Sequence, residues 1–322
     1  MASQNPARDR RLGARVGRYV RWGQVRPALQ AVMPPVAQQE MLLSGSATLN
    51  AQIWFSQFPL RPTSGWAVIA ALLAVGSLTR PLALDWRDVA LLLLLADPLW
   101  GSIWRMAAGR LEMLPLREPD ARPQVWLPYL EPKSPAARLL GRDDHGVLHL
   151  VMRVVFPTVA LALAVALVLG QQAVLLTLLV AGLSVGGWIA RHSVQHVPAF
   201  FHSAVTVALP WLLALHQAGV TPAHERWPAY MTLIALWFLH NWGEGRCLRR
   251  TGDRLGVGLL AVADVGMALL LIVARAPLWL ALMSVLWLPT WLLVYQRRPL
   301  QRLNFWWLAA MLVSGVALGQ SG

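Results

Sequence analysis

Long apolar stretches alternate with short polar ones over most of the chain, which predicts a bundle of membrane-spanning helices. Each apolar stretch is close to the length of about 20 residues that a helix needs to cross a bilayer core. Nine stretches meet this criterion, and they occupy residues 64–83, 88–107, 147–169, 171–190, 197–217, 227–243, 255–274, 277–295 and 303–319. The predicted fold is therefore all-α, a polytopic bundle of about nine transmembrane helices without an internal repeat.

Residues 1–62 differ from the rest and are predicted to form a basic cytoplasmic or interfacial arm. Arginines recur at helical spacing among Val16, Tyr19, Val20 and Trp22, which suggests a surface helix on anionic headgroups. A disordered basic tail is the alternative for the first dozen residues. Residues 41–62 are too polar to cross a membrane, and no cleavable signal peptide is visible. Residues 63–322 then form the transmembrane bundle.

The polar segments between the predicted spans indicate the orientation of the chain. Basic residues gather in the arm and in the loops after spans two, six and eight, and Arg191 follows span four, whereas the other loops hold only Arg80, Arg87, Arg226 and Arg275. The positive-inside rule therefore places the N-terminus in the cytoplasm and the C-terminus outside, in a bacterial inner or cytoplasmic membrane. The longest loop, residues 105–146, contains six prolines, and it is either a functional segment or a docking surface.

Composition supports a membrane protein and excludes several other classes. The chain is 57% hydrophobic and 13% charged, whereas soluble domains carry about 25% charged residues. Its net charge of +13 comes mostly from arginines placed between apolar runs. Anionic lipid headgroups explain that excess better than nucleic acid does. The single cysteine, Cys247, excludes an internal disulfide and any cysteine-cluster metal site.

Two polar segments carry the chain's candidate chemistry, LADPLWGSIWR around Ala96–Trp104 and RRTGDR at Arg249–Arg254, which is followed by GVGLLAV. Together with nine spans and long loops after the second and sixth, these segments resemble the UbiA superfamily of intramembrane prenyltransferases over residues 64–319. In that family two aspartate-rich motifs hold Mg²⁺, which binds the diphosphate of a prenyl donor. Hard cations on carboxylates suit such a leaving group, since they absorb its developing charge.

Several individual residues of this chain match positions in the motifs of that family. Asp97 stands where the first aspartate of the first motif belongs, while Trp100 and Trp104 occupy the region of the other acids. In the second motif Asp253 matches the second aspartate, and Arg249 replaces the first. The family often places a basic residue that faces the diphosphate after the fourth span, and Arg191 lies there. Asp97 also has a purely structural explanation, as a partner of an arginine such as Arg105 or as a cap at Pro98.

Histidines and further acids supply the remaining candidates. His192 and His196 share a helical face at a spacing that suits a metal or a pigment's magnesium, although hydrogen bonds to backbone or water are the alternative. His240 and Glu244 also share a face and are candidates for an acid–base pair, unless Glu244 pairs with Arg246 or Arg249. Asp264 is expected to be buried and partnered, with Arg153 as a candidate counter-ion. Trp287, near mid-span, is a candidate contact for a flat or isoprenoid ligand.

Three functional hypotheses follow from these residues. Arginines and tryptophans in place of motif aspartates favour a non-catalytic UbiA-like protein that holds an isoprenoid, quinone or tetrapyrrole-type lipid, alone or as a subunit of a larger membrane complex. The alternative is an active prenyltransferase that uses Mg²⁺ and an aromatic or tetrapyrrole acceptor. A small transporter with Asp97, Arg153 and Asp264 as an intramembrane charge set is the third, and the missing inverted repeat counts against it.

The geometric prediction is that Asp97, Arg191, Glu244 and Asp253 converge on one cytoplasm-facing cavity. The candidate site residues are Asp97, Glu244 and Asp253 for catalysis; Arg105, Arg191, Arg246, Arg249, Arg250 and Arg254 for ligand or anion binding; and His192, His196 and His240 as ligands of a pigment or metal. Membrane lipids and the isoprenoid or tetrapyrrole-type ligand are the expected partners, and nucleic acid is not.

Overall fold

The computed structural model describes residues 59–78, 84–108, 156–193, 199–249, 252–298 and 300–321. All of these residues belong to a single unit, Thr48–Gly322. The predicted arm up to residue 58 and most of the predicted loop 105–146 lie outside the described residues. The predictions for those two segments therefore stay predictions.

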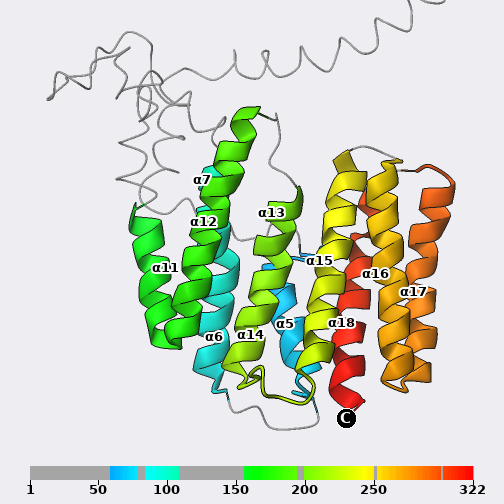
Figure 1. Cartoon of the computed structure of the whole chain (residues 1–322), viewed down its shortest axis with the longest axis horizontal. Helices are drawn as coiled ribbons and strands as arrows, with labels where there is room; N and C mark the ends of the chain where they lie inside the picture. Colours follow the sequence, from blue (N-terminus) through cyan, green and yellow to red (C-terminus); the bar gives the residue numbers. More distant parts are fainter. Residues whose placement is uncertain are drawn as a thin grey trace, which may run out of the picture. The chain divides into compact units, whose positions relative to one another are not determined.

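Within the described ranges the regular elements are all helical, and they form nine rods (Figure 1). The rods are α5 (Ser64–Ala74), α6–η1–α7 (Trp86–Leu94, Leu95–Leu99 and Trp100–Ala108), α11 (Phe156–Leu169), α12 (Gln171–Ser193), α13–η4–α14 (Ala199–Ser203, Ala204–Ala208 and Leu209–Gln217), α15 (Trp227–Arg249), α16 (Arg254–Val273), α17 (Pro277–Tyr295) and α18 (Asn304–Gln320), with the short 3-10 helix η5 (Leu300–Leu303) before α18. Each rod falls on one predicted apolar range. The all-α prediction is thus confirmed for this part of the chain.

Two predicted helix ends were wrong. The first span was predicted to reach residue 83, but α5 ends at Ala74 because Gly76 adopts a left-handed φ of 93°. The backbone N–H of Gly76 bonds to the carbonyl of Leu73, and that of Ser77 to Leu72, a pattern that closes a helix C-terminus. The sixth span was predicted to end at residue 243, whereas α15 continues to Arg249.

Two rods contain a turn of π-helix, and both turns lie next to a proline. Pro98 lies within η1, and Pro210 follows η4 by two residues. A proline inside a helix cannot donate its backbone hydrogen bond and crowds the preceding turn, which a wider π-turn accommodates. Both π-turns contact α5. The two rods that contain these π-turns therefore meet α5 partly through irregular backbone.

Helix α5 packs closely against α18 through small residues on both helices. Ala67, Ala70, Ala71 and Ala74 are fully buried in α5. On α18 a Cβ atom at Gly315 would lie 2.5 Å from the backbone oxygen of Ala70, so only glycine permits this approach. Gly315 and Gly319 form a GxxxG pattern, which is typical of helix contacts inside membranes.

Helices α15 and α16 form an antiparallel hairpin with a similar close contact. Gly252, with φ of 77°, reverses the chain, and the Asp253 side chain caps α16 by accepting from the N–H of Gly256 at 2.9 Å. A Cβ at Gly243 would lie 2.8 Å from the backbone oxygen of Gly256. The two backbones therefore approach closely at Gly243, about one helical turn from His240.

Three helical segments in the described ranges are long and apolar enough to cross a membrane: Ala199–Gln217, α16 and α17. Helices α16 and α17 lie side by side at one edge of the bundle (Figure 1). Both present large aliphatic side chains outward, including Val265, Leu269, Val285 and Leu288, which are about 60% exposed. A surface of this kind is unusual for a protein in water.

Candidate functional site

Two buried carboxylates meet at the start of α5. The Ser64 hydroxyl donates to Asp97 at 3.0 Å, and Arg61 donates through Nε to Glu244 Oε1 at 2.8 Å. Arg61 and Ser64 are three residues apart, so Asp97 on η1 and Glu244 on α15 approach the same segment of chain. We call this set, with Thr63, the α5 junction.

The α5 junction is built to hold negative charge. Asp97 is 4% exposed and Glu244 is fully buried. The positive end of the α5 helix dipole and the Arg61 guanidinium both lie beside these acids, which offsets the cost of burying them. Glu244 Oε2 and the hydroxyl of Thr63 nevertheless have no hydrogen-bond partner among the described residues. The junction therefore retains an unused acceptor and an unused hydroxyl in its interior.

Asp253 occupies a different position, at the end of the α15–α16 hairpin. Its carboxylate accepts from Arg246 Nε at 2.6 Å and caps α16. The hydrogen bond to Asp253 raises the pKa of the Arg246 guanidinium above its ordinary value. This carboxylate is committed to local structure. Asp97 and Glu244 thus contact the same segment of chain, whereas Asp253, at the start of α16, binds Arg246. The convergence of all four predicted residues on one cavity stays a prediction, because the side chain of Arg191 lies outside the described residues.

A second polar cluster joins α15, α16, α17 and α18, about one turn of α15 away from Glu244. His240 of α15 places Nδ1 3.5 Å from Asp264 Oδ1 of α16, and Trp291 of α17 donates to Asp264 Oδ2 at 3.0 Å. The rings of Trp237 and Trp307 lie 5.0 and 5.6 Å from the His240 ring. We call these five residues the His240 cluster. His240 is 3% exposed and its Nε2 has no hydrogen-bond partner in the described part of the chain.

This geometry corrects two predicted pairings. His240 and Glu244 do not form an acid–base pair, because His240 faces Asp264 and Glu244 faces Arg61. Glu244 also does not pair with Arg246, which binds Asp253 instead. The four-residue spacing on α15 was read correctly as helical, but each side chain found a partner on another element. Asp264 is buried and partnered as predicted, with His240 and Trp291 as partners.

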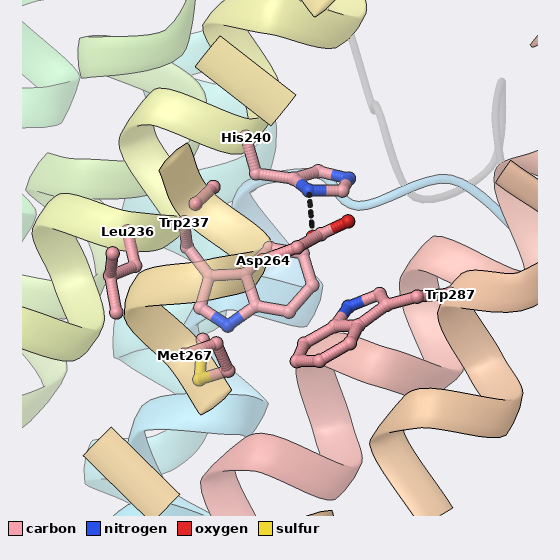
Figure 2. A pocket seen from close by; sticks show the side chains of 7 residues that line it. Leu236, Trp237, His240, Asp264, Met267 and Trp287 are labelled. Atoms are coloured by element: carbon pink, nitrogen blue, oxygen red, sulfur yellow. Dashed lines mark ion pairs between the residues drawn. The ribbon is translucent and has the colours of Figure 1, made fainter. Parts of the chain in front are cut away.

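Trp287 lines two voids beside the His240 cluster, and Figure 2 shows the residues around the smaller one. The inner cavity is about 10 Å³ and is lined by Leu236, Trp237, His240, Ala263, Asp264, Met267 and Trp287. That is close to the space of one water molecule. The outer void is an open groove of about 480 Å³ along α17, lined by Ser284, Trp287, Leu288, Trp291, Leu292 and Tyr295. We call it the aromatic groove.

The other predicted site residues can be placed only in part. Arg254 is exposed at the first turn of α16. Arg105, Arg191, His192 and Arg249 lie in helices, but their side chains are outside the described set, as are Arg250 and His196 altogether. The described side chains contain no group of three or more His, Cys, Asp or Glu arranged to hold a metal ion.

Sequence reasoning did not identify Arg61 or Ser64, which were assigned to the arm and to a span start. No local pattern connects Arg61 with Glu244, which are 183 positions apart. The His240–Asp264 pair did carry a signal, because both residues lie equally far from Gly252 along an antiparallel hairpin.

No protein-family model, curated protein or solved structure matches the chain.

Proposed function

We propose that the chain is an integral membrane protein that holds an isoprenoid, quinone or tetrapyrrole-type lipid inside its helix bundle without transferring a prenyl group. The observation that carries this proposal is the commitment of all three candidate catalytic carboxylates to protein partners. Ser64 binds Asp97, Arg61 binds Glu244, and Arg246 binds Asp253. Prenyl transfer with Mg²⁺ would require such oxygens to coordinate cations instead.

The two tryptophans at motif positions support the same proposal. Trp100 is fully buried and donates to the Thr177 hydroxyl of α12 at 3.1 Å. Trp104 is 4% exposed and packs against His202 of α13, with ring centroids 5.7 Å apart and the ring planes tilted by 43°. Large rings fill the space in which the resemblance would place metal-binding acids. Replacing them with aspartate would open cavities, so these positions favour packing over catalysis.

A membrane location is supported by the outward faces of the bundle. Aliphatic side chains of α16 and α17 are exposed over the whole length of both helices, and α11 and α12 expose Leu161, Leu167, Leu175 and Leu179. Lipid tails solvate such faces at no cost, whereas water does not. A second membrane subunit against the α16–α17 face would satisfy it equally well. The proposal therefore includes a role within a larger membrane complex.

One observation favours the alternative, an active prenyltransferase. Glu244 Oε2 is buried without a hydrogen-bond partner in the described residues, and it lies in the same junction as Asp97. A buried carboxylate oxygen of this kind is an available ligand for a cation that also binds Asp97. The Arg61 guanidinium would then face the diphosphate.

The deciding experiment is gentle purification from the native membrane, followed by an absorption spectrum and mass spectrometry of extracted small molecules and co-purifying chains. A stoichiometric quinone, pigment or other isoprenoid lipid, or fixed partner subunits, is the expected result. A protein that carries prenyl diphosphate with Mg²⁺, and that transfers the prenyl group to an added acceptor, would establish the alternative.

A further inference from the structure

The inner cavity and the aromatic groove share one wall, the indole of Trp287. In Figure 2 the His240 ring and the Asp264 carboxylate lie on one side of the inner cavity, and Trp287 closes the side opposite to Trp237. The polar pair is thus one side chain away from a groove that opens on the exposed face of α17. Pro289 lacks the N–H that would bond to Val285 four residues earlier, which loosens the turn that carries Trp287.

His240 is held firmly and keeps one nitrogen unused. Trp237 is anchored to the Ser314 hydroxyl at 2.9 Å, and Trp307 to the Thr290 hydroxyl at 3.0 Å, so the two rings that flank His240 are fixed by α18 and α17. Nδ1 faces Asp264, which favours a proton on that nitrogen. Nε2, buried without a partner among the described residues, is left to interact with a ligand. A buried polar atom is costly unless something binds it.

The aromatic groove has the lining of a site for a flat ring. It is a shallow, open surface formed by residues of α17 alone, so a ring bound there would lie against one face of this helix. Two indoles four residues apart line it on one face of α17: Trp291 is half-buried, and Trp287 is 8% exposed, so its ring becomes available for stacking only when it rotates. Trp291 is itself bonded to Asp264, so the groove wall and the His240 cluster form one connected unit.

We propose that the aromatic groove binds a quinone-class headgroup, and that an oxygen of this ring reaches His240 Nε2 when Trp287 rotates. The proposal rests on the lipid-binding function proposed above and names its site and ligand class. With Nδ1 protonated toward Asp264, Nε2 accepts from a quinol hydroxyl; as an imidazolium it donates to a quinone carbonyl. Either redox form of the ring can thus be bound, and no electron transfer is implied.

The inner cavity also discriminates between ligand classes. Its volume of about 10 Å³ beside His240 suits a single oxygen atom in the place of one water. A tetrapyrrole macrocycle would need flat open space over Nε2 to bring its metal within bonding distance. Among the ligands in the proposed function, a quinone with an isoprenoid tail fits this arrangement best, because its tail can lie along the exposed apolar face of α17.

The first test blocks the groove from outside, where a substitution cannot disturb the core. Ser284 and Val285 are neighbouring exposed positions on α17, and only Ser284 lines the groove. Binding of a ubiquinone with a two-isoprene tail to the purified full chain in nanodiscs is measured by quenching of tryptophan fluorescence. Ser284→Trp should weaken binding by about tenfold or more, whereas Val285→Trp should stay within about twofold of wild type. Equal binding by both variants would overturn the proposal.

The second test separates headgroup from tail. His240→Leu should weaken ubiquinone binding by about tenfold, while His240→Gln, which keeps a donor and an acceptor, should retain most of it. Binding of squalene, an isoprenoid hydrocarbon without a polar head, should not change in either variant. If His240→Leu fails to fold, His240→Gln and the comparison of Ser284→Trp with Val285→Trp still test the proposal.

The outcomes distinguish this inference from the proposed function. If isoprenoid lipids co-purify or bind, but the groove and His240 variants bind ubiquinone as the wild type does, the site assignment is wrong and the lipid-binding function stands. If the wild type binds squalene but not ubiquinone, the quinone class is wrong. If no isoprenoid lipid of any kind binds or co-purifies, the proposed function fails as well.

Discussion

A single arginine, Arg61, neutralises the most deeply buried carboxylate of the α5 junction. Glu244 is fully buried, whereas the Arg61 side chain is 21% exposed. Removing Arg61 leaves a carboxylate with no route to water, but removing the charge of Glu244 leaves a guanidinium that can still reach solvent. The two halves of this pair should therefore differ in their effect on stability.

We predict that Arg61→Ala lowers the free energy of unfolding by about 2 kcal/mol or more, while Glu244→Gln costs less than half of that. In the double variant Arg61→Ala/Glu244→Gln much of the loss should be recovered, because the buried charge is gone. Thermal unfolding in mild detergent measures all three. Additive losses in the double variant would mean that the pair contributes nothing through its charge.

Cys247 offers a second check at the scale of one side chain. It lies beyond the predicted span 227–243, is 4% exposed, and would be 2.7 Å from a Cβ on Gly256. Burial, helped by the nearby Asp253 carboxylate, raises the pKa of the Cys247 thiol to about 11. Since the thiolate is the reactive form, the raised pKa keeps this thiol protonated and inert at neutral pH.

We therefore expect maleimide labelling of the folded protein at pH 7.5 to be slow, and to accelerate as the pH approaches 11. Labelling should be rapid after denaturation in dodecyl sulfate. Ser321→Cys in a Cys247→Ser background provides an exposed thiol as the control. Rapid labelling of Cys247 at neutral pH would show that the α15–α16 contact opens readily.

At the scale of elements, the contact between α18 and α5 depends on glycine. A methyl group on Gly315 would lie 2.5 Å from a backbone oxygen of α5, which cannot move without separating the helices. Gly258 is a matched control, because a Cβ there would meet nothing within 4 Å. The two positions thus differ only in what surrounds them.

We predict that Gly315→Ala lowers the free energy of unfolding by about 1–3 kcal/mol, measured by thermal unfolding in detergent. Gly258→Ala should be neutral or stabilising by up to about 1 kcal/mol, since alanine favours the helix. A loss of α5 docking should also release the α5 junction, so Gly315→Ala should weaken the coupling between Arg61 and Glu244. Equal effects of both substitutions would show that the helices are not in close contact.

At the scale of the whole molecule, the sequence was informative about helices and much less about their partners. Apolar runs of bilayer length mark the rods because they follow from burial and hydrogen bonding within each segment. The early end of α5 depended on one left-handed glycine, Gly76, and the π-turns on the packing around Pro98 and Pro210. The GxxxG pattern of α18 does not specify which helix packs against it, so the contact with α5 could not be predicted from it.

In the candidate site, too, the residues could be selected from the sequence more readily than their contacts. Asp97, Glu244, His240 and Asp264 could be selected because ionisable groups in apolar segments are costly and need partners. The His240–Asp264 pairing follows from the symmetry of a hairpin about Gly252, a local feature. Arg61–Glu244 brings together residues 183 positions apart, and it depends on where the start of α5 enters the bundle. Such contacts belong to the assembled molecule, and no segment taken alone specifies them.

The orientation of the whole bundle can be tested with the same cysteine-free background. The basic residues predict that the loop after α17 is cytoplasmic, whereas the loop before α15 and the end of α18 lie outside. Gln296, Ala223 and Ser321 are exposed at these three places. With Cys247→Ser as parent, a membrane-impermeant maleimide added to intact cells should label Ala223→Cys and Ser321→Cys, and should label Gln296→Cys only after permeabilisation. The reverse labelling pattern would mean that the bundle is inverted, with Arg246 and Asp253 outside. Labelling of all three positions in intact cells would contradict a membrane-spanning bundle.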